Sequence, residues 1–246
     1  MSKKILIIPT YNEKYNVPIL YKKIRKYNKN LEILFVEDNS PDKTIDVIRT
    51  IQKKDNKVKV LLRRKKKGIG SAHKKAISWA VKRNYNLCIT MDADLTHDPK
   101  YIPKMIKFSP KYHLVQTNRF LDKKSIASWP VYRRWLTRSR FLLLKFLLNI
   151  NCDSSGAFRC YNFKKLDYRL LLFAKNNSYS FFWESIYILI KERSTIKEIK
   201  MVQKYRSIGS SKMEFKHWFH GLYYLFIIYL KDLLNISYKQ KELSED

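Results

Sequence analysis

In the N-terminal part of the chain, short runs of apolar residues alternate with segments whose apolar residues recur at helical spacing. The runs are typical of strands that are buried on both faces of a parallel sheet. Between them, apolar side chains recur every three or four residues, as at Val17, Leu20 and Ile24, which predicts helices. Repeated strand–helix units predict an α/β fold with right-handed crossovers. The predicted strands are residues 5–8, 31–36, 58–62 and 87–91, and the predicted helices are residues 17–27, 45–51 and 72–81.

A polar loop follows each of these predicted strands. Tyr11, Asp38, Gly68 and Asp94 lie in the four loops. Because the carboxyl ends of parallel strands meet at one edge of a sheet, we expect the loops to converge there. Open α/β sheets bind ligands at this edge, and a nucleotide is the expected ligand.

The loop after the fourth predicted strand carries two carboxylates, Asp92 and Asp94. Converging carboxylates suit Mg²⁺ or Mn²⁺, which take oxygen ligands and often share them with substrate phosphates. Alone, such a pair is also typical of a solvated turn. His97 follows closely, and we expect it to be a hydrogen-bonded turn histidine rather than a metal ligand.

Gly68 and Gly70 follow five consecutive cations and open a predicted helix. This order favours an anion bound at the helix N-terminus, with a solvated basic turn as an equal alternative. The spacing excludes a Walker loop and a complete dinucleotide fingerprint.

The chain has 51 Lys and Arg against 21 Asp and Glu, a formal net charge of +30. Such an excess indicates a nucleotide, a nucleic acid or an anionic membrane surface as partner, although biased amino-acid usage accounts for part of it. A nucleic-acid-binding protein is therefore the alternative from a different class. The cations are spread along the chain and no nucleic-acid-binding module is recognisable, so we expect no nucleic-acid partner.

Composition and cysteine spacing indicate a folded protein from a reducing compartment. Hydrophobic residues make up 45% of the 246 residues, which favours a folded core. Cys88, Cys152 and Cys160 lack the spacing of a zinc site or a disulfide framework, which indicates a reducing compartment. The N-terminus runs directly into a predicted strand, so no signal peptide is expected.

Seven segments together resemble the inverting family 2 glycosyltransferases with the GT-A fold, and among them the catalytic subunits of the dolichol-phosphate mannosyltransferases. Three positions depart from that pattern: Glu37 replaces the usual Asp, Lys43 the usual Gly and Ser155 the usual Thr. Lys43 puts the turn geometry there in question. The segments are residues 8–13, 36–44, 68–73, 91–99, 153–159, 179–184 and 206–212.

The resemblance implies a Rossmann-like, mostly parallel central sheet flanked by helices, with C-terminal interfacial helices. It implies a GT-A domain over residues 1–213, followed by a C-terminal helix and tail over residues 214–246. Within the domain, the nucleotide-binding half covers about residues 1–99 and the acceptor half about residues 100–213.

The resemblance also implies roles for individual residues. Asp94, Arg119 and Arg133 are the expected catalytic residues, and the two arginines would bind the acceptor phosphate. Glu184 would orient the arginine cluster. Residues expected to bind the metal are Asp92, Asp94 and Thr96, and those expected to bind the donor nucleotide sugar are Pro9, Tyr11, Glu13, Asp38, Asp92, Ala93, Arg206, Ser211 and Lys212. Arg134, Arg138 and Arg140 are expected to be solvated cations.

The implied reaction is transfer of mannose from GDP-mannose to dolichyl phosphate with inversion and with Mg²⁺ or Mn²⁺. The product, dolichyl β-D-mannosyl phosphate, is the mannosyl donor for N-glycosylation, GPI anchors and O-mannosylation. The implied location is the cytosolic face of the endoplasmic reticulum membrane. A polyprenyl-phosphate glycosyltransferase that uses UDP-glucose or another nucleotide sugar is the close alternative.

Residues 135–150 and 218–230 combine apolar and aromatic side chains with basic ends. The second run is too short for a membrane span, which needs about 20 apolar residues. Both segments are predicted to be interfacial helices, and a helix packed on the domain is the alternative for the second. Small membrane-anchoring subunits are expected as partners.

Overall fold

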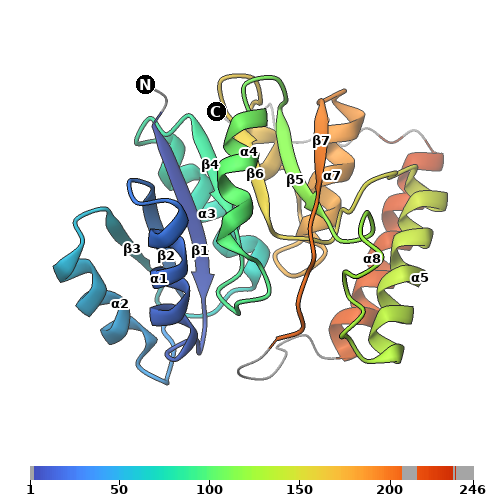
Figure 1. The fold of residues 1–246 in the computed structure, drawn as a ribbon. Coiled ribbons are helices and arrows are strands. Elements are labelled where there is room, and N and C mark those ends of the chain that lie inside the picture. The colour runs from blue at the N-terminus through green and yellow to red at the C-terminus, as the bar shows by residue number, and fades with distance from the viewer. Residues whose placement is uncertain (1–2, 207–214, 235, 237–246) are drawn as a thin grey trace.

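The computed structural model describes residues 3–206, 215–234 and 236. These residues form a seven-stranded sheet in the order β3-β2-β1-β4-β6-β5-β7 (Figure 1). Paired strands are parallel except at β6, which is antiparallel to both β4 and β5. The predicted mostly parallel sheet is confirmed. The strands are β1 (Lys4–Thr10), β2 (Glu32–Glu37), β3 (Val58–Leu62), β4 (Leu87–Thr90), β5 (Leu114–Asn118), β6 (Arg159–Asn162) and β7 (Ile196–Lys200).

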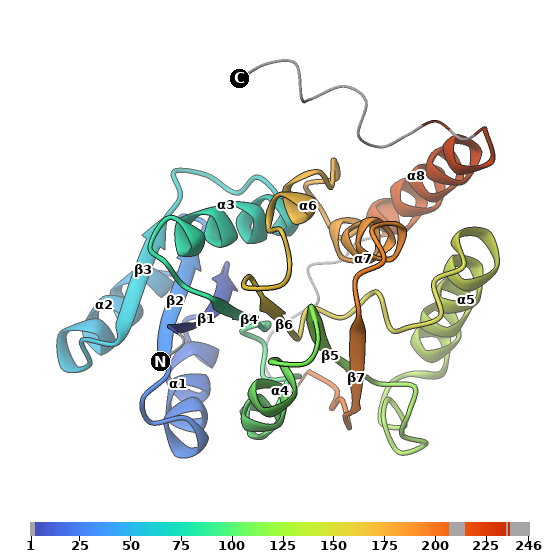
Figure 2. The same cartoon turned by 90° about the horizontal axis from the view of Figure 1, so that it is seen from above.

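Helices cover both faces of the sheet. Figure 2 shows α1 and α4 on one face, and α3, α6 and α7 on the other. Alternation along β1 explains the two layers, because Ile5 and Ile7 pack into the core with α3 and α7, whereas Leu6 and Ile8 pack with α1 and α4. The helices are α1 (Asn16–Tyr27), α2 (Thr44–Lys54), α3 (Ile69–Val81), α4 (Ile102–Phe108), α5 (Val131–Leu148), α6 (Arg169–Leu172), α7 (Phe181–Lys191) and α8 (Phe215–Leu233).

The loops after β1, β2 and β4 meet at the carboxyl edge of the sheet. β1 lies between β2 and β4, and all three strands run in the same direction. The N–H of Asp38 donates to the carbonyl of Thr10 at 3.2 Å, and the N–H of Asn12 donates to the Ser40 hydroxyl at 3.0 Å. The first two loops are therefore held against each other by hydrogen bonds.

Lys43 precedes α2 in the left-handed region, with φ 64° and ψ 29°. A side chain with a Cβ costs about 1–2 kcal/mol there, whereas glycine adopts this conformation freely. We expect Lys43→Gly to raise the free energy of unfolding by up to about 1 kcal/mol, because the entropic cost of glycine offsets part of the relief.

Urea unfolding of Lys43→Gly beside Lys43→Ala measures this effect. The alanine variant removes the charge but keeps the Cβ, so it should show no gain in stability. If Lys43→Gly unfolds at lower urea than both other proteins, the strain is absent.

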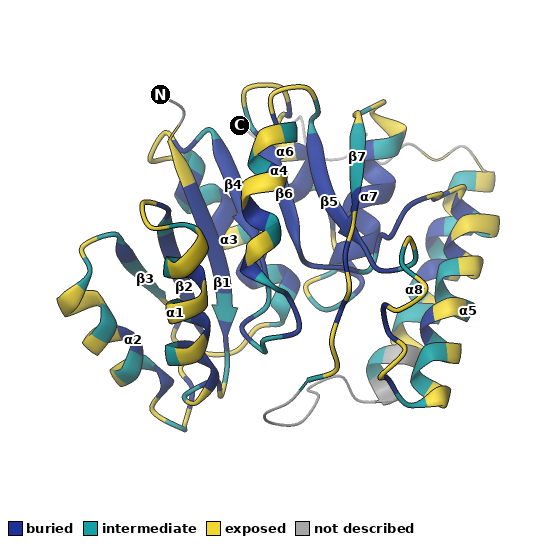
Figure 3. Cartoon of the chain, in the orientation of Figure 1, coloured by how far each residue is buried: buried dark blue, intermediate teal, exposed yellow. Residues whose placement is uncertain are grey.

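The helices α5 and α8 lie side by side at the β7 end of the sheet (Figures 1 and 2). Both predicted helices are confirmed as helices. Figure 3 shows exposed residues along their outer faces. None of the helices in the described ranges is long and apolar enough to cross a membrane. The large apolar side chains exposed here are Val131, Tyr132, Trp135, Leu142, Leu143 and Phe146 on α5, and Phe219, Tyr223, Phe226, Leu230 and Leu233 on α8.

Candidate active site

Arg206 connects two of the predicted nucleotide-binding loops. Its Nη2 lies 2.7 Å from Glu13 Oε1, although the two residues are 193 positions apart. Its Nε lies 3.6 Å from Asp94 Oδ2. The segment after β7 therefore reaches back to the loops after β1 and β4, and it places a guanidinium between their carboxylates.

Asp92 and Asp94 are partly buried at the end of β4. Burial, and then the neighbouring charge of Asp94, raise the pKa of Asp92 to about 7. Asp94 Oδ1 accepts hydrogen bonds from the Thr96 N–H at 3.1 Å and from the Thr96 hydroxyl at 2.7 Å. Thr96 thus orients Asp94 in this structure, and its role as a metal ligand stays a prediction.

His97 is buried against Phe158, with ring centroids 5.2 Å apart. Its Nδ1 accepts a hydrogen bond from the Asp92 N–H at 3.1 Å. Burial lowers the pKa of His97 to about 4, so the ring is neutral at physiological pH. The expectation of a hydrogen-bonded turn histidine is confirmed, and the ring holds the backbone of Asp92 in place.

Asp38 is buried beside Arg63, the first residue of the basic run that follows β3. Arg63 Nη1 lies 3.2 Å from Asp38 Oδ1, and Arg63 Nη2 donates to the Ser71 hydroxyl at 3.0 Å. The N–H of Arg63 also donates to the Glu37 carbonyl at 2.8 Å. Arg63 is buried whereas the four cations after it are exposed, because it alone directly continues β3.

The departure at Glu37 is accommodated inside the fold. Its side chain is fully buried and accepts hydrogen bonds from the Thr10 hydroxyl and from the Ser40 N–H. Glu37 therefore holds the first two loops together and leaves Asp38 directed to Arg63.

Three further residues predicted to bind the donor lie near this edge. Tyr11 is partly exposed, and the Lys66 ammonium lies 4.4 Å from the centre of its ring. Pro9 is partly buried in β1, and Ala93 is buried between Asp92 and Asp94. Ser211 and Lys212 lie outside the described residues.

The two glycines before α3 are required by packing. A Cβ on Gly68 would lie 2.2 Å from the Asn177 carbonyl oxygen, and one on Gly70 would lie 2.5 Å from Phe181 Cβ. The Ser71 N–H donates to the same Asn177 carbonyl at 3.1 Å. A protein carbonyl thus takes one of the amides at this helix start, and an anion bound there stays a prediction.

Arg119 is buried in an ion pair with Asp153. Its Nε lies 2.7 Å from Asp153 Oδ2, and its backbone N–H donates to the same oxygen at 3.2 Å. Although burial opposes the shift, Arg119 holds the pKa of Asp153 below its usual range. Glu198 on β7 accepts from the Asp153 N–H at 2.8 Å and from Asn118 Nδ2 at 2.9 Å. It therefore holds Asp153 and the residue before Arg119 in place.

Among the remaining predicted residues, Arg140 and Glu184 differ from the expectation, whereas the acceptor role of Arg133 stays a prediction. Arg133 packs over the rings of Trp129 and Tyr205, at 5.1 and 5.6 Å from their centres. Arg140 was expected to be solvated, but it is partly buried and lines a pocket. Glu184 was expected to orient arginines. It instead accepts from the N–H groups of residues 175 and 176.

Donor-nucleotide affinity is expected to fall as pH falls through about 6. Burial raises the pKa of Asp38 to about 6, although Arg63 favours the carboxylate. Protonation removes a hydrogen-bond acceptor, so affinity should fall about tenfold from pH 7 to pH 5. The pKa of Asp38 is higher in the folded than in the unfolded protein. Protonation of Asp38 therefore stabilises the fold as pH falls from 6 to 4. Unfolding does not explain the loss of nucleotide affinity.

Calorimetric titration with GDP-mannose at several pH values measures this effect, since its diphosphate carries no monoester group that titrates near pH 6. Asp38→Asn should bind more weakly at pH 7 and show a smaller pH dependence, the part that remains belonging to Asp92. Identical profiles for the wild type and Asp38→Asn would contradict the assignment.

The sheet and its carboxyl edge define an α/β protein that gathers carboxylates and arginines where such folds bind phosphate-bearing ligands. The chain belongs to glycosyl transferase family 2, whose family model matches residues 5–170. The resemblance seen in the sequence is thereby confirmed at the level of the family, and the chain is a glycosyltransferase.

Two relatives align with this chain over most of their length. It is 29% identical over 210 residues to undecaprenyl-phosphate mannosyltransferase of Micrococcus luteus, covering 85% of this chain and 86% of that protein. It is 27% identical over 215 residues to polyprenol monophosphomannose synthase of Mycolicibacterium smegmatis, covering 86% and 81%. Both relatives are bacterial, and neither name specifies dolichol.

Solved structures support the GT-A fold. Glucosyl-3-phosphoglycerate synthase of Mycobacterium tuberculosis, in complex with Mn²⁺, UDP and phosphoglyceric acid, superposes with a TM-score of 0.63 at 13% identity, covering 94% of this chain and 78% of that one. A mannosyltransferase of Pyrobaculum calidifontis, in complex with GDP-mannose and Mn²⁺, superposes with a TM-score of 0.59 at 14% identity. The superposition covers 96% of this chain and 65% of that one. At these identities the likeness concerns the fold.

Proposed function

We propose that this glycosyltransferase transfers mannose from GDP-mannose to a polyprenyl phosphate with inversion. The arrangement of Asp92 and Asp94 beside Arg206 carries the proposal, because it offers oxygen ligands and a cation to a sugar nucleotide at one point. The two full-length relatives that act on polyprenyl carriers support mannose and the lipid acceptor. Dolichyl phosphate as the acceptor is the finer form of the same proposal.

A divalent cation, Mg²⁺ or Mn²⁺, fits the chemistry of Asp92 and Asp94. The raised pKa of Asp92 reflects burial and the charge of Asp94, an unfavourable pairing that a cation would relieve. No group of three or more His, Cys, Asp or Glu that could hold a metal occurs in the described ranges, so the substrate would supply further oxygen ligands. When bound, the ion neutralises charge on the departing nucleoside diphosphate.

The acceptor chemistry needs cations more than a strong base. A phosphate monoester has a second pKa of about 6, so it is mostly a dianion at neutral pH and already nucleophilic. The chain must then hold two anionic substrates against each other. Arg119 would face the acceptor phosphate, and its pairing with Asp153 fixes the orientation of the guanidinium.

The exposed faces of α5 and α8 suit a membrane surface. Trp135, Phe146, Phe219 and Tyr223 are each more than 60% exposed, and such aromatic side chains favour the headgroup region. The proposal includes the cytosolic face of the endoplasmic reticulum membrane and small anchoring subunits. Vesicle flotation tests it: the protein alone should float with anionic vesicles and leave them at high salt, and resistance to alkaline wash would contradict interfacial binding.

Transfer of labelled mannose from GDP-mannose to a short polyprenyl phosphate tests the activity. Lipid-extractable label should form, and EDTA should abolish it until Mn²⁺ or Mg²⁺ is restored. The donor nucleotide is identified by comparing how far GDP-mannose and UDP-glucose, each with Mn²⁺, protect the protein from thermal unfolding. Absence of labelled lipid, or protection by UDP-glucose alone, would overturn the stated donor.

A further inference from the structure

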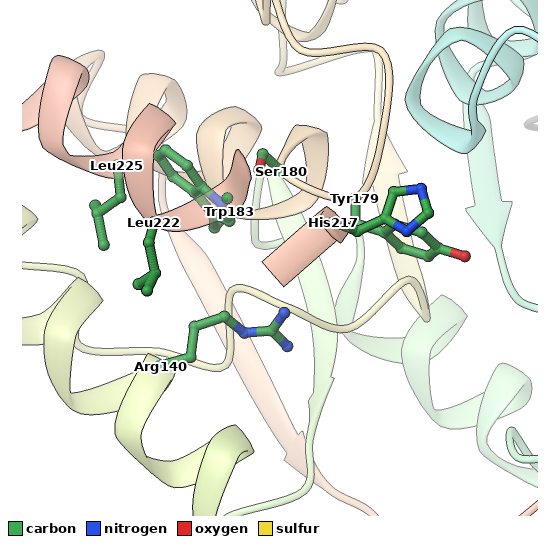
Figure 4. A pocket seen from close by; sticks show the side chains of 8 residues that line it. Arg140, Tyr179, Ser180, Trp183, His217, Leu222 and Leu225 are labelled. Atoms are coloured by element: carbon green, nitrogen blue, oxygen red, sulfur yellow. The ribbon is translucent and has the colours of Figure 1, made fainter. Parts of the chain in front are cut away.

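A small pocket lies where α5, α7 and α8 meet, and none of its lining residues is predicted to bind the donor. Figure 4 shows Arg140 extending from α5 toward the space between α7 and the start of α8. The helices α5 and α8 pack directly against each other around it. The pocket is lined by Arg140, Tyr179, Ser180, Trp183, His217, Gly221, Leu222 and Leu225.

Arg140 is a partly buried cation without a carboxylate partner. In residues 3–206, 215–234 and 236, no carboxylate lies within ion-pair distance of its guanidinium, and no hydrogen bond satisfies it. Burial, and then repulsion from Arg119, lower the pKa of Arg140 to about 10. A partly desolvated guanidinium directed into a pocket attracts an anion, because the charge has lost part of its water without gaining a counterion among the described residues.

The pocket is close to the predicted acceptor end of the active site. Arg119 and Asp153 lie near enough to Arg140 to shift its pKa, Arg119 downward and Asp153 upward. The positive charge of Arg119 is already offset by Asp153 at 2.7 Å, and Arg133 packs over two aromatic rings. An incoming dianion therefore finds at Arg140 a positive charge with which no carboxylate of the described residues forms an ion pair.

The walls of the pocket suit a ligand with an anionic head and an apolar chain. Tyr179 and His217 contact each other edge to face, with ring centroids 5.3 Å apart, and they bring polar atoms to one side. Trp183, Leu222 and Leu225 supply apolar surface on the other. Small sugar phosphates and inorganic phosphate would leave that apolar surface unused.

We propose that Arg140 binds the phosphate of the isoprenoid acceptor and that Trp183, Leu222 and Leu225 contact the first part of its chain. This assignment rests on the proposed function and adds a binding residue to it. A membrane phospholipid carries the same combination of phosphate and apolar chain, so the experiment must separate the two sources.

Kinetics in detergent with farnesyl phosphate as acceptor test the assignment. Arg140→Gln should raise the acceptor KM about tenfold or more, the usual effect of losing a charge-assisted hydrogen bond, while the donor KM stays within about twofold. Arg140→Lys should recover part of the loss. Arg138→Gln, which removes one exposed cation from the same helix, should leave both constants within about twofold. An unchanged acceptor KM in Arg140→Gln would overturn the proposal.

Binding measured without donor separates this inference from the proposed reaction. Fluorescence of Trp183 should change on titration with farnesyl phosphate, and Trp183→Phe should remove that signal. Wild type should bind farnesyl phosphate more tightly than inorganic phosphate or farnesol, and Arg140→Gln should lose the preference over farnesol. If wild type makes no mannosyl lipid but keeps this Arg140-dependent binding, the reaction is wrong and the site stands.

Competition identifies the source of the phosphate. Phosphatidylglycerol in mixed micelles should displace farnesyl phosphate poorly. If it displaces farnesyl phosphate efficiently, and Arg140→Gln weakens only binding to anionic vesicles, the pocket holds a membrane phospholipid and the acceptor assignment is wrong.

Discussion

Asp94→Asn is expected to reduce mannosyl transfer about a thousandfold while leaving the fold intact. The asparagine oxygen can still accept the hydrogen bonds from Thr96, so the loop after β4 keeps its shape. The carboxylate charge that faces Arg206 and a divalent cation is lost, and removing such an interaction at the reacting phosphates costs several kcal/mol in the transition state. The charge that helps raise the pKa of Asp92 is also lost, so stability should not fall.

Initial rates with saturating GDP-mannose, together with thermal unfolding, measure both parts of this expectation. Asp98→Asn is the matched control, because Asp98 lies in the same loop and its side chain accepts from the Lys100 N–H at a helix start, a role asparagine fills equally well. The control should keep its rate within a few fold. If Asp94→Asn keeps a tenth of wild-type activity, Asp94 is not essential to the transfer.

The nucleotide half of the fold follows from the sequence because its signals are local. Each of β1, β2 and β4 is a short apolar run, and the strand-end rule alone predicts that Asp38 and Asp94 approach each other. The acceptor half lacks such signals. β6 has the sequence Arg-Cys-Tyr-Asn, and Nη2 of its fully buried Arg159 donates to the carbonyls of Ser154 and Phe182. A polar strand of this kind becomes stable only when its partners are in place.

The same distinction explains which site residues were found. Asp92 and Asp94 form a motif, and Arg119 was expected from the family resemblance. The pairing of Arg119 with Asp153, and of Asp153 with Glu198, depends on contacts between positions 34 and 45 apart in the chain. Arg140 was wrongly expected to be solvated, because the position of α8 beside α5 is a tertiary feature with no local pattern. The sequence therefore does not predict which of these charged residues are buried.

Asp153→Asn is expected to cost about 3–5 kcal/mol of folding stability, because it leaves the buried guanidinium of Arg119 without a counterion. The Arg119 backbone N–H also loses its charged acceptor. Transfer should fall at least about tenfold, since the guanidinium is no longer held toward the acceptor phosphate. Asp167→Asn breaks an exposed pair with Arg169 and should change stability little. Urea unfolding and acceptor kinetics measure the two losses.

The double variant Arg119→Met/Asp153→Asn separates structure from function. Removing both charges avoids the unpaired buried cation, so part of the stability lost in Asp153→Asn should return. Transfer should stay low, because methionine offers the acceptor phosphate no donor and no charge. If transfer instead recovers together with stability, Arg119 acts only through the fold, and the acceptor phosphate is held by other cations, with Arg140 the first candidate.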